Sequence, residues 1–223
     1  MMGYSHVVSG AVVGLALLPT APVNSPAERV AWVLMWAGSA LLPDLDSPGA
    51  SASRMWGPVS RALSVVVSRV SGGHRWGTHD LVLGPLAFGA LAAVGVLVPP
   101  AATLVVAAAL GLAVHGLHVT RLWRVGPLVN LLASWIGAVW IIAYDWVGVG
   151  WWLPIAVAGG VAVAILGDWL TNEGVPVPLL WLRNRSHRWA LGAFRTGAVI
   201  ESALVAPALT LAVILLAARG TLF

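Results

Sequence analysis

The chain has 223 residues, of which 59% are hydrophobic and only 9% are charged. A soluble domain carries about 25% charged residues, so a soluble fold of this size would leave too much apolar surface in contact with water. A bilayer accepts apolar side chains on the outside of a helix bundle, and the composition therefore predicts an integral membrane protein.

The formal net charge of +4 comes from twelve basic residues, all Arg, and eight acidic ones. The Arg residues are spread over several loops, so we expect no nucleic-acid partner. The chain has no Cys, which excludes a disulfide framework and a thiolate metal site.

A helix that spans a bilayer needs roughly 20 apolar residues, with about 17 to 25 tolerated. Seven such stretches predict an all-α bundle of about seven transmembrane helices, which we interpret as a single integral membrane domain, residues 1–223. The first stretch has no Lys/Arg region before it, so we interpret it as a retained helix and not as a signal peptide. The seven stretches are residues 5–22, 27–43, 81–98, 101–119, 126–143, 149–170 and 197–218.

Two polar segments interrupt this pattern. Residues 54–70, between the second and third predicted helices, form an amphipathic segment that is expected to lie in the headgroup region. Its Arg residues are Arg54, Arg61 and Arg69, and its apolar side, facing lipid or the bundle, holds Trp56, Leu63, Val66 and Val67. The other polar segment is the loop of residues 175–195.

Trp residues near the ends of the predicted helices indicate an aromatic belt at the membrane surface. These residues are Trp32, Trp36, Trp146, Trp151, Trp152 and Trp189.

The distribution of Arg predicts the orientation, because basic residues concentrate in cytoplasmic loops. With the N-terminus in the cytoplasm, only Arg29 and Arg219 lie outside. The remaining Arg residues, including Arg121 and Arg124, then lie inside. We therefore expect a multi-pass protein of the inner (cytoplasmic) membrane with a cytoplasmic N-terminus.

The same topology gathers most acids and histidines at the cytoplasmic side, and only Glu28 and Asp145 lie opposite. An ionisable group inside a membrane is costly unless it is paired or ligated, so this clustering predicts a functional site. Mixed imidazole and carboxylate donors suit Zn²⁺, Mn²⁺ or Fe²⁺. The gathered residues are His6, Asp44, Asp46, His74, His79, Asp80, His115, His118, Asp168 and Glu201.

Simpler structural roles remain open for several of these residues. Asp44 and Asp46 are compatible with a Pro-bracketed turn, and Thr78 with Asp80 could cap the helix that follows them. His115 and His118 fit a helix end at the membrane surface as well as they fit a site.

Four motifs give the sequence a resemblance to a family of bacterial and phage membrane proteins. The motifs are Gly-Tyr-Ser-His, Leu-Leu-Pro-Asp-Leu-Asp-Ser-Pro, His-Arg-x-x-Thr-His, and Gly-Asp-x-Leu-Thr followed by Gly-Val-Pro and Leu-Leu-Trp. With them the chain resembles the membrane-bound metal-dependent hydrolases, also called LexA-binding, inner-membrane-associated hydrolases. By position, the resemblance implicates His6, Asp44, Asp46, His74, Arg75, Thr78, His79, Asp168 and Thr171.

The sequence departs from that family at two positions. Ala164 stands where the family usually has His, one helical turn before Asp168, and Asp80 stands where it often has Ser. Either His115, His118 or Asp80 replaces the missing ligand, or the site is weakened.

The resulting hypothesis is a metal-dependent hydrolase that acts on a phosphoester or lipid-like substrate at the cytoplasmic face. Its metal, with Zn²⁺ or Mn²⁺ favoured, would be held by His6, Asp44, Asp46, His79 and Asp168. The catalytic candidates are His74, as a ligand or general base, Arg75, as a phosphate partner, and Thr78, which would orient a ligand or water.

The alternative is a non-enzymatic membrane protein, either a small transporter or a partner-binding protein, that uses the same acids and histidines. The sequence leaves the substrate, the metal and the oligomeric state open.

Overall fold

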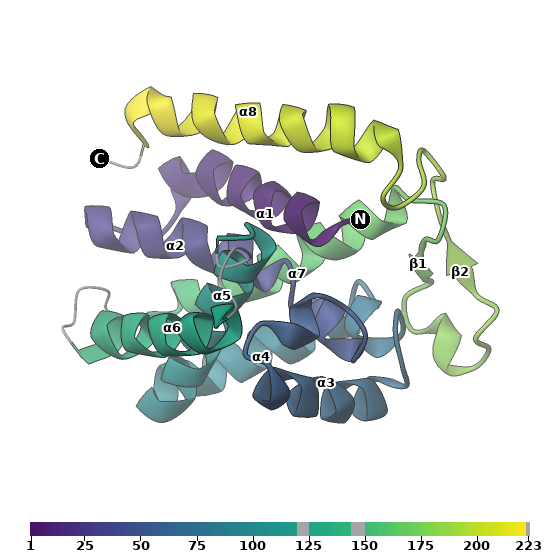
Figure 1. Cartoon of the computed structure of the whole chain (residues 1–223), viewed down its shortest axis with the longest axis horizontal. Helices are drawn as coiled ribbons and strands as arrows, with labels where there is room; N and C mark the ends of the chain where they lie inside the picture. Colours follow the sequence, from purple (N-terminus) through teal and green to yellow (C-terminus); the bar gives the residue numbers. More distant parts are fainter. Residues whose placement is uncertain (120–124, 144–149, 222–223) are drawn as a thin grey trace.

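The computed structural model describes residues 1–119, 125–143 and 150–221, and in these ranges it is an all-α bundle with one short hairpin (Figure 1). The predicted all-α class is confirmed. Arg121, Arg124, Asp145 and Trp146 lie outside the described residues. The helices are α1 Gly3–Leu17, α2 Pro26–Ser39, α3 Pro58–Ser71, α4 Leu83–Leu97, α5 Pro99–Gly116, α6 Gly126–Ala143, α7 Trp152–Trp169 and α8 Ala206–Leu216, and the hairpin pairs β1 Val175–Pro176 with β2 Arg188–Trp189.

Local sequence signals fix where α2 begins. Ser25 accepts a hydrogen bond from the Glu28 backbone N–H, and the Glu28 carboxylate accepts one from the Ser25 N–H, which forms a capping box. Pro26 occupies the first turn, where its missing N–H costs nothing. The Glu28 carboxylate therefore serves to cap α2.

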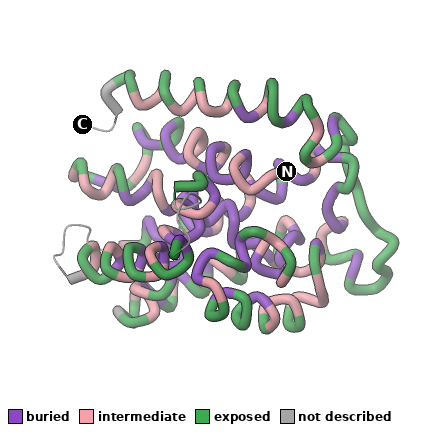
Figure 2. Tube along the Cα trace, viewed as in Figure 1, coloured by how far each residue is buried: buried purple, intermediate pink, exposed green. Residues whose placement is uncertain are grey.

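The helix α7 lies at the centre of the bundle and α8 at its edge. α7 packs against α4, α2 and α1, whereas α8 lies along α1 (Figure 1). The apolar stretch around α7 is 56% buried within the protein, against 6% for the stretch around α8, and Figure 2 shows the same contrast between the interior and α8. Residues at the end of α7 are therefore well placed to belong to an internal site.

Small residues allow the helices of this bundle to approach closely. A Cβ atom at Gly159 of α7 would lie 2.0 Å from the ring of Trp36 on α2. A Cβ atom at Gly38, also on α2, would lie 1.9 Å from the backbone oxygen of Ala109 on α5. The contacts of α2 with α7 and α5 thus require glycine at these two positions.

Three stretches in the described part of the chain are long and apolar enough to cross a membrane: Gly3–Thr20, Trp152–Trp169 and Glu201–Arg219. Shorter apolar helices are Leu83–Leu97, Pro100–Gly116 and Gly126–Ile142. These stretches support a membrane helix bundle, while the count of seven crossings stays a prediction.

The predicted aromatic belt is wrong for three of its members. Trp32, Trp36 and Trp152 are 2%, 5% and 4% exposed. Their rings pack together, with centroids 5.6 Å apart for Trp32 and Trp36 and 6.4 Å for Trp32 and Trp152. These Trp side chains fill the space between α2 and α7, whereas Trp151 and Trp189 are exposed as expected.

The predicted amphipathic segment forms α3 and the turn before it. Ser60 and Ser64 of α3 are buried, whereas Val66 and Val70 are exposed. Trp56 lies in the turn before α3, and its indole N–H donates to Ser134 of α6 at 3.0 Å. The segment therefore has an exposed apolar face and is anchored to the bundle through Trp56.

We expect Gly38→Ala to destabilise the protein, because the added methyl group would meet the backbone of α5. Overpacking of this kind costs about 1 to 3 kcal/mol, which thermal unfolding in detergent would detect. Gly49→Ala is the matched control, since a Cβ at Gly49 has nothing within 4 Å. Equal melting temperatures for the two variants would contradict the close contact of α2 with α5.

Candidate metal centre at one end of the bundle

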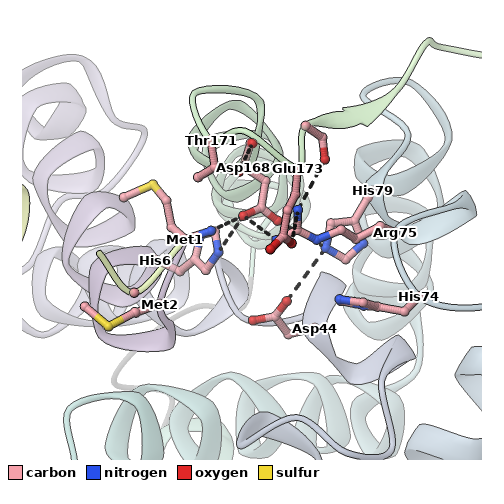
Figure 3. A network of polar contacts seen from close by, with 12 residues as sticks. Met1, Met2, His6, Asp44, His74, Arg75, His79, Asp168, Thr171 and Glu173 are labelled. Carbon is pink, nitrogen blue, oxygen red and sulfur yellow. Dashed lines mark hydrogen bonds and ion pairs between the residues drawn. The ribbon is translucent and has the colours of Figure 1, made fainter. Parts of the chain in front are cut away.

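The structure brings all eight predicted site residues together at one end of the bundle. They come from the start of α1, the turn Pro43–Asp46 after α2, the loop before α4, and the end of α7. Figure 3 labels all of them except Asp46 and Thr78. These residues are His6, Asp44, Asp46, His74, Arg75, Thr78, His79 and Asp168.

Asp168 lies between the two buried histidines (Figure 3). Its Oδ1 atom is 3.4 Å from Nε2 of His6, and its Oδ2 atom is 3.4 Å from Nε2 of His79. The same His79 nitrogen is 3.7 Å from Oδ1 of Asp44. Two imidazoles and two carboxylates therefore converge on one small volume.

Two sets of donors lie close enough to hold an ion, with ligand atoms within 4.8 Å of one another in each set. One set is His6, Asp44 and Asp168, and the other is Asp46, His74 and His79. The first set, joined by Nε2 of His79, fits an ion better, because that nitrogen is buried without a hydrogen-bond partner although two carboxylates face it. This donor chemistry matches that of Zn²⁺ or Mn²⁺ sites.

The carboxylate of Asp46 faces the other side of His79 and is fully buried. Its Oδ1 contacts Nδ1 of His74 at 2.6 Å. Its Oδ2 contacts Nδ1 of His79 at 3.1 Å and accepts from the Arg75 backbone N–H at 2.9 Å and the Thr78 hydroxyl at 2.5 Å. Because four donors already occupy these two oxygens, the geometry favours Asp46 as the group that orients both histidines over its predicted role as a ligand.

The hydrogen bonds around Asp46 also set the charges of the loop. Burial acts to raise the pKa of Asp46, but the hydrogen bonds with His74 and His79 outweigh burial and hold the pKa well below its usual range. Burial acts to lower the pKa of His79, but the surrounding carboxylates, Asp168 first, raise it well above 6.5. Without a metal ion, this pair is therefore a carboxylate and an imidazolium.

Asp168 is 1% exposed and is surrounded by positive groups. Nη2 of Arg75 is 3.4 Å from its Oδ1, and the amino group of Met1 contacts the same oxygen. Nη1 of Arg75 forms a 2.9 Å ion pair with Glu173, whose side chain is 55% exposed. The sequence prediction did not use Glu173, although it follows Asp168 by five residues in a polar loop.

The two threonines of the motifs have separate roles. The Thr78 hydroxyl contacts both Asp46 and, at 3.1 Å, Nδ1 of His79. The Thr171 hydroxyl donates to the backbone oxygen of Asp168 at 2.7 Å and so closes the end of α7. Thr78 therefore positions the Asp46 carboxylate, whereas Thr171 fixes the backbone that carries Asp168.

Asp80 does not replace the family histidine in whose position this chain has Ala164. Its Oδ1 accepts from the backbone N–H groups of Val82 and Leu83 at the start of α4. Its Oδ2 accepts from the Leu179 N–H and the Trp181 indole N–H, both at 2.7 Å. Asp80 therefore ties α4 to the loop of residues 175–195.

His115 and His118 do not join the donors either. They line a separate cavity of about 820 Å³ between the start of α1, the end of α5 and α8. Tyr4 of α1 also lines this cavity, and its ring is stacked on that of His118 with centroids 6.5 Å apart. In the described part of the chain, the position of Ala164 is thus left without a substitute ligand.

The fold and this cluster define an all-α membrane protein with a histidine and aspartate centre at one end of its bundle. Residues 1–119 match the family model described as YdjM inner membrane protein, and since the match covers more than half of the chain, the chain belongs to that family. No curated protein and no solved structure matches the chain significantly. The family supports the inner-membrane location, while hydrolytic activity and LexA binding stay predictions.

The shifted pKa values predict a stability optimum in metal-free protein. The raised pKa of His79 contributes stability below pH 6.5 that is lost as pH rises through its folded pKa. The lowered pKa of Asp46 contributes stability above pH 3.8 that is lost on acidification. With chelator present, the melting temperature should therefore be highest between these values and fall on the alkaline side. His79→Gln should flatten the alkaline fall, and an unchanged slope would argue against the buried imidazolium.

Asp80→Asn should loosen the loop of residues 175–195, because an amide accepts the Leu179 and Trp181 hydrogen bonds less strongly than a carboxylate. A hydrogen bond to a charged group contributes about 1.5 to 3 kcal/mol. Limited trypsin digestion checks this prediction, since the loop contains Arg183, Arg185 and Arg188. Faster cleavage at these residues is expected, and cleavage at the wild-type rate would show that Asp80 does not hold the loop.

Proposed function

We propose that this protein is a metal-dependent hydrolase that acts on a phosphoester or lipid-like substrate at the cytoplasmic face of the inner membrane. The observation that carries the proposal is the convergence of His6, Asp44, His79 and Asp168 at one end of a membrane helix bundle. The cytoplasmic side and the cytoplasmic N-terminus rest on the distribution of Arg residues.

The metal would be held by the imidazoles of His6 and His79 and the carboxylates of Asp44 and Asp168. A divalent ion in such a site lowers the pKa of a bound water and polarises a phosphoryl oxygen. The position of Asp46 behind His79 supports this assignment, because a carboxylate on the far nitrogen fixes the tautomer and the orientation of a ligating histidine.

His74 is the group best placed to move a proton. Its side chain is 45% exposed, and its Nδ1 contacts Asp46 at 2.6 Å. A carboxylate on Nδ1 leaves Nε2 free to accept a proton, as a general base requires. Thr78 supports this role by holding Asp46 in place.

Arg75 would contribute positive charge beside the reacting phosphoryl group. Its guanidinium lies between Asp168 and the exposed carboxylate of Glu173, and the Asp44 side chain is 21% exposed. The exposed side of the site is therefore polar, with Asp44, His74 and Glu173 reaching solvent, and a charged head group would approach Arg75 from this side.

The alternative of a transporter has less support. A transport pathway needs polar groups that continue to the far side, for which the sequence offers Glu28 and Asp145. Glu28 caps α2 through hydrogen bonds with Asn24 and Ser25, and Asp145 lies outside the described residues.

Metal analysis of the purified protein tests the proposal. After loading with Zn²⁺ or Mn²⁺ and removal of free ions, wild type should retain about one ion per chain. The double variant Asp44→Ala/Asp168→Ala should retain almost no metal, because two of the four metal-binding side chains are lost. His115→Gln is the control, because it changes a histidine of the separate cavity and should keep the ion.

Equal metal content in wild type and the double variant would overturn the metal site. Bound metal without cleavage of any phosphoester or lipid substrate would overturn the hydrolase assignment and favour a binding protein.

A further inference from the structure

Three arginine side chains lead outward from the candidate metal centre along the loop of residues 175–195. Arg75 contacts Asp168, and its Nη1 also lies 3.4 Å from the backbone oxygen of Gly174. Nη2 of Arg188 donates to that same Gly174 oxygen at 3.1 Å and to the backbone oxygen of Glu173 at 3.2 Å. The guanidinium of Arg188 is therefore one carbonyl group away from that of Arg75.

Arg188 shares an aromatic platform with a third arginine. The guanidinium carbon of Arg188 lies 5.4 Å from the ring centroid of Trp76, and that of Arg185 lies 5.2 Å from it. Trp181 packs against Trp76 with centroids 5.6 Å apart. Stacking on aromatic faces orients guanidinium groups and leaves their edges free to bind an anion.

Glycine at position 72 leaves room for the side chain of Arg185. A Cβ atom at Gly72 would lie 3.1 Å from Nη2 of Arg185. Gly72 ends α3 with a φ of 82°, which favours glycine. Together with the bonds of Asp80 to the loop, Gly72 and Trp76 hold Arg185 in a defined place.

The positive charges of this cluster exceed the negative ones. Arg75 pairs with Glu173 and Asp168, whereas Arg185 and Arg188 form no ion pair within the described ranges. Burial and the neighbouring Arg75 lower the pKa of Arg188. Arg75 and Arg188, which share the Gly174 oxygen, repel one another, and an anion beside them would relieve the repulsion.

We propose that Arg185 and Arg188, stacked on Trp76, form a phosphate-binding subsite that holds the head group of the substrate beside the metal centre. The proposal rests on the proposed function and names a substrate class for it, a phosphate-bearing head group. A guanidinium group can donate two parallel N–H bonds to two oxygens of one phosphate group. Arg185 and Arg188 therefore offer the donors that a phosphate group next to the metal centre needs. Arg75 lies between this subsite and Asp168, so a bound head group would extend from the loop toward the donors.

Phosphate binding by the full chain tests the subsite. The protein would be placed in phosphatidylcholine nanodiscs, kept metal-free with chelator, and titrated with inorganic phosphate and inorganic diphosphate at constant ionic strength by calorimetry. Arg185→Gln with Arg188→Gln should weaken binding at least about tenfold, the loss of roughly one charge-assisted hydrogen bond. Arg183→Gln is the matched control, an exposed arginine of the same loop with no contact to Trp76 in the described part of the chain.

A second arm separates lipid from free phosphate as the source. Phosphatidic acid added to the nanodiscs should weaken diphosphate binding to wild type several-fold by competition, with no such effect in the double variant. Competition identifies a lipid head group, and binding without competition identifies a free phosphate compound.

Equal affinity in wild type and the double variant would overturn the subsite, as would an equal loss in Arg183→Gln, which would indicate general charge attraction. Because these titrations contain no metal, their outcome is independent of the metal analysis, and either proposal can fail alone.

Discussion

The buried carboxylate of Asp46 is the interaction on which the site depends. In the loop before α4, it accepts hydrogen bonds from the Thr78 hydroxyl and the Arg75 backbone N–H, and it contacts Nδ1 of both His74 and His79. Leaving such a carboxylate without partners would cost several kcal/mol, so the loop has to fold around it. The loop in turn holds Arg75 at a φ of 62°, a strained conformation for a residue other than glycine. One carboxylate thus orients the buried imidazole of His79 toward the donors, the partly exposed imidazole of His74 toward solvent and the guanidinium of Arg75 toward Asp168.

Much of the fold and the site could be predicted from the sequence, because hydropathy and motif spacing are local properties. The apolar runs located the helices, and the clustering of His6, Asp44, His79 and Asp168 followed from placing helix ends on one side of a bilayer. The separate tasks of Asp44 and Asp46 could not be predicted, because the two residues are only two positions apart and differ in how the turn directs their side chains. Trp32, Trp36 and Trp152 were misassigned because a Trp near a helix end fits the membrane surface and the bundle interior equally well in sequence.

The loop of residues 175–195 was predicted as a polar segment, but its contacts were not. Its contacts with Asp80, Trp76 and Gly72 join segments about a hundred residues apart. A local pattern contains no information about such pairs. The sequence predicted that Asp80 could cap the following helix, and its Oδ1 does accept from the N–H groups of Val82 and Leu83. Its bond to Trp181 joins segments too far apart in the chain for a local pattern to predict. The family model matches residues 1–119, so this loop and Asp168 lie outside the matched residues, although the Gly-Asp-x-Leu-Thr motif resembles the family there.

The contribution of α7 has a consequence for how the protein is made. All candidate donors except Asp168 are synthesised before α5, whereas Asp168 follows at the end of α7. During synthesis, the loop with His79 and Arg75 is therefore made before its partner Asp168, with the helices α4, α5 and α6 between them. The arrival of α7 then brings the Asp168 carboxylate to His79 and Arg75, so the packing of α7 into the bundle and the completion of the donor set are a single event.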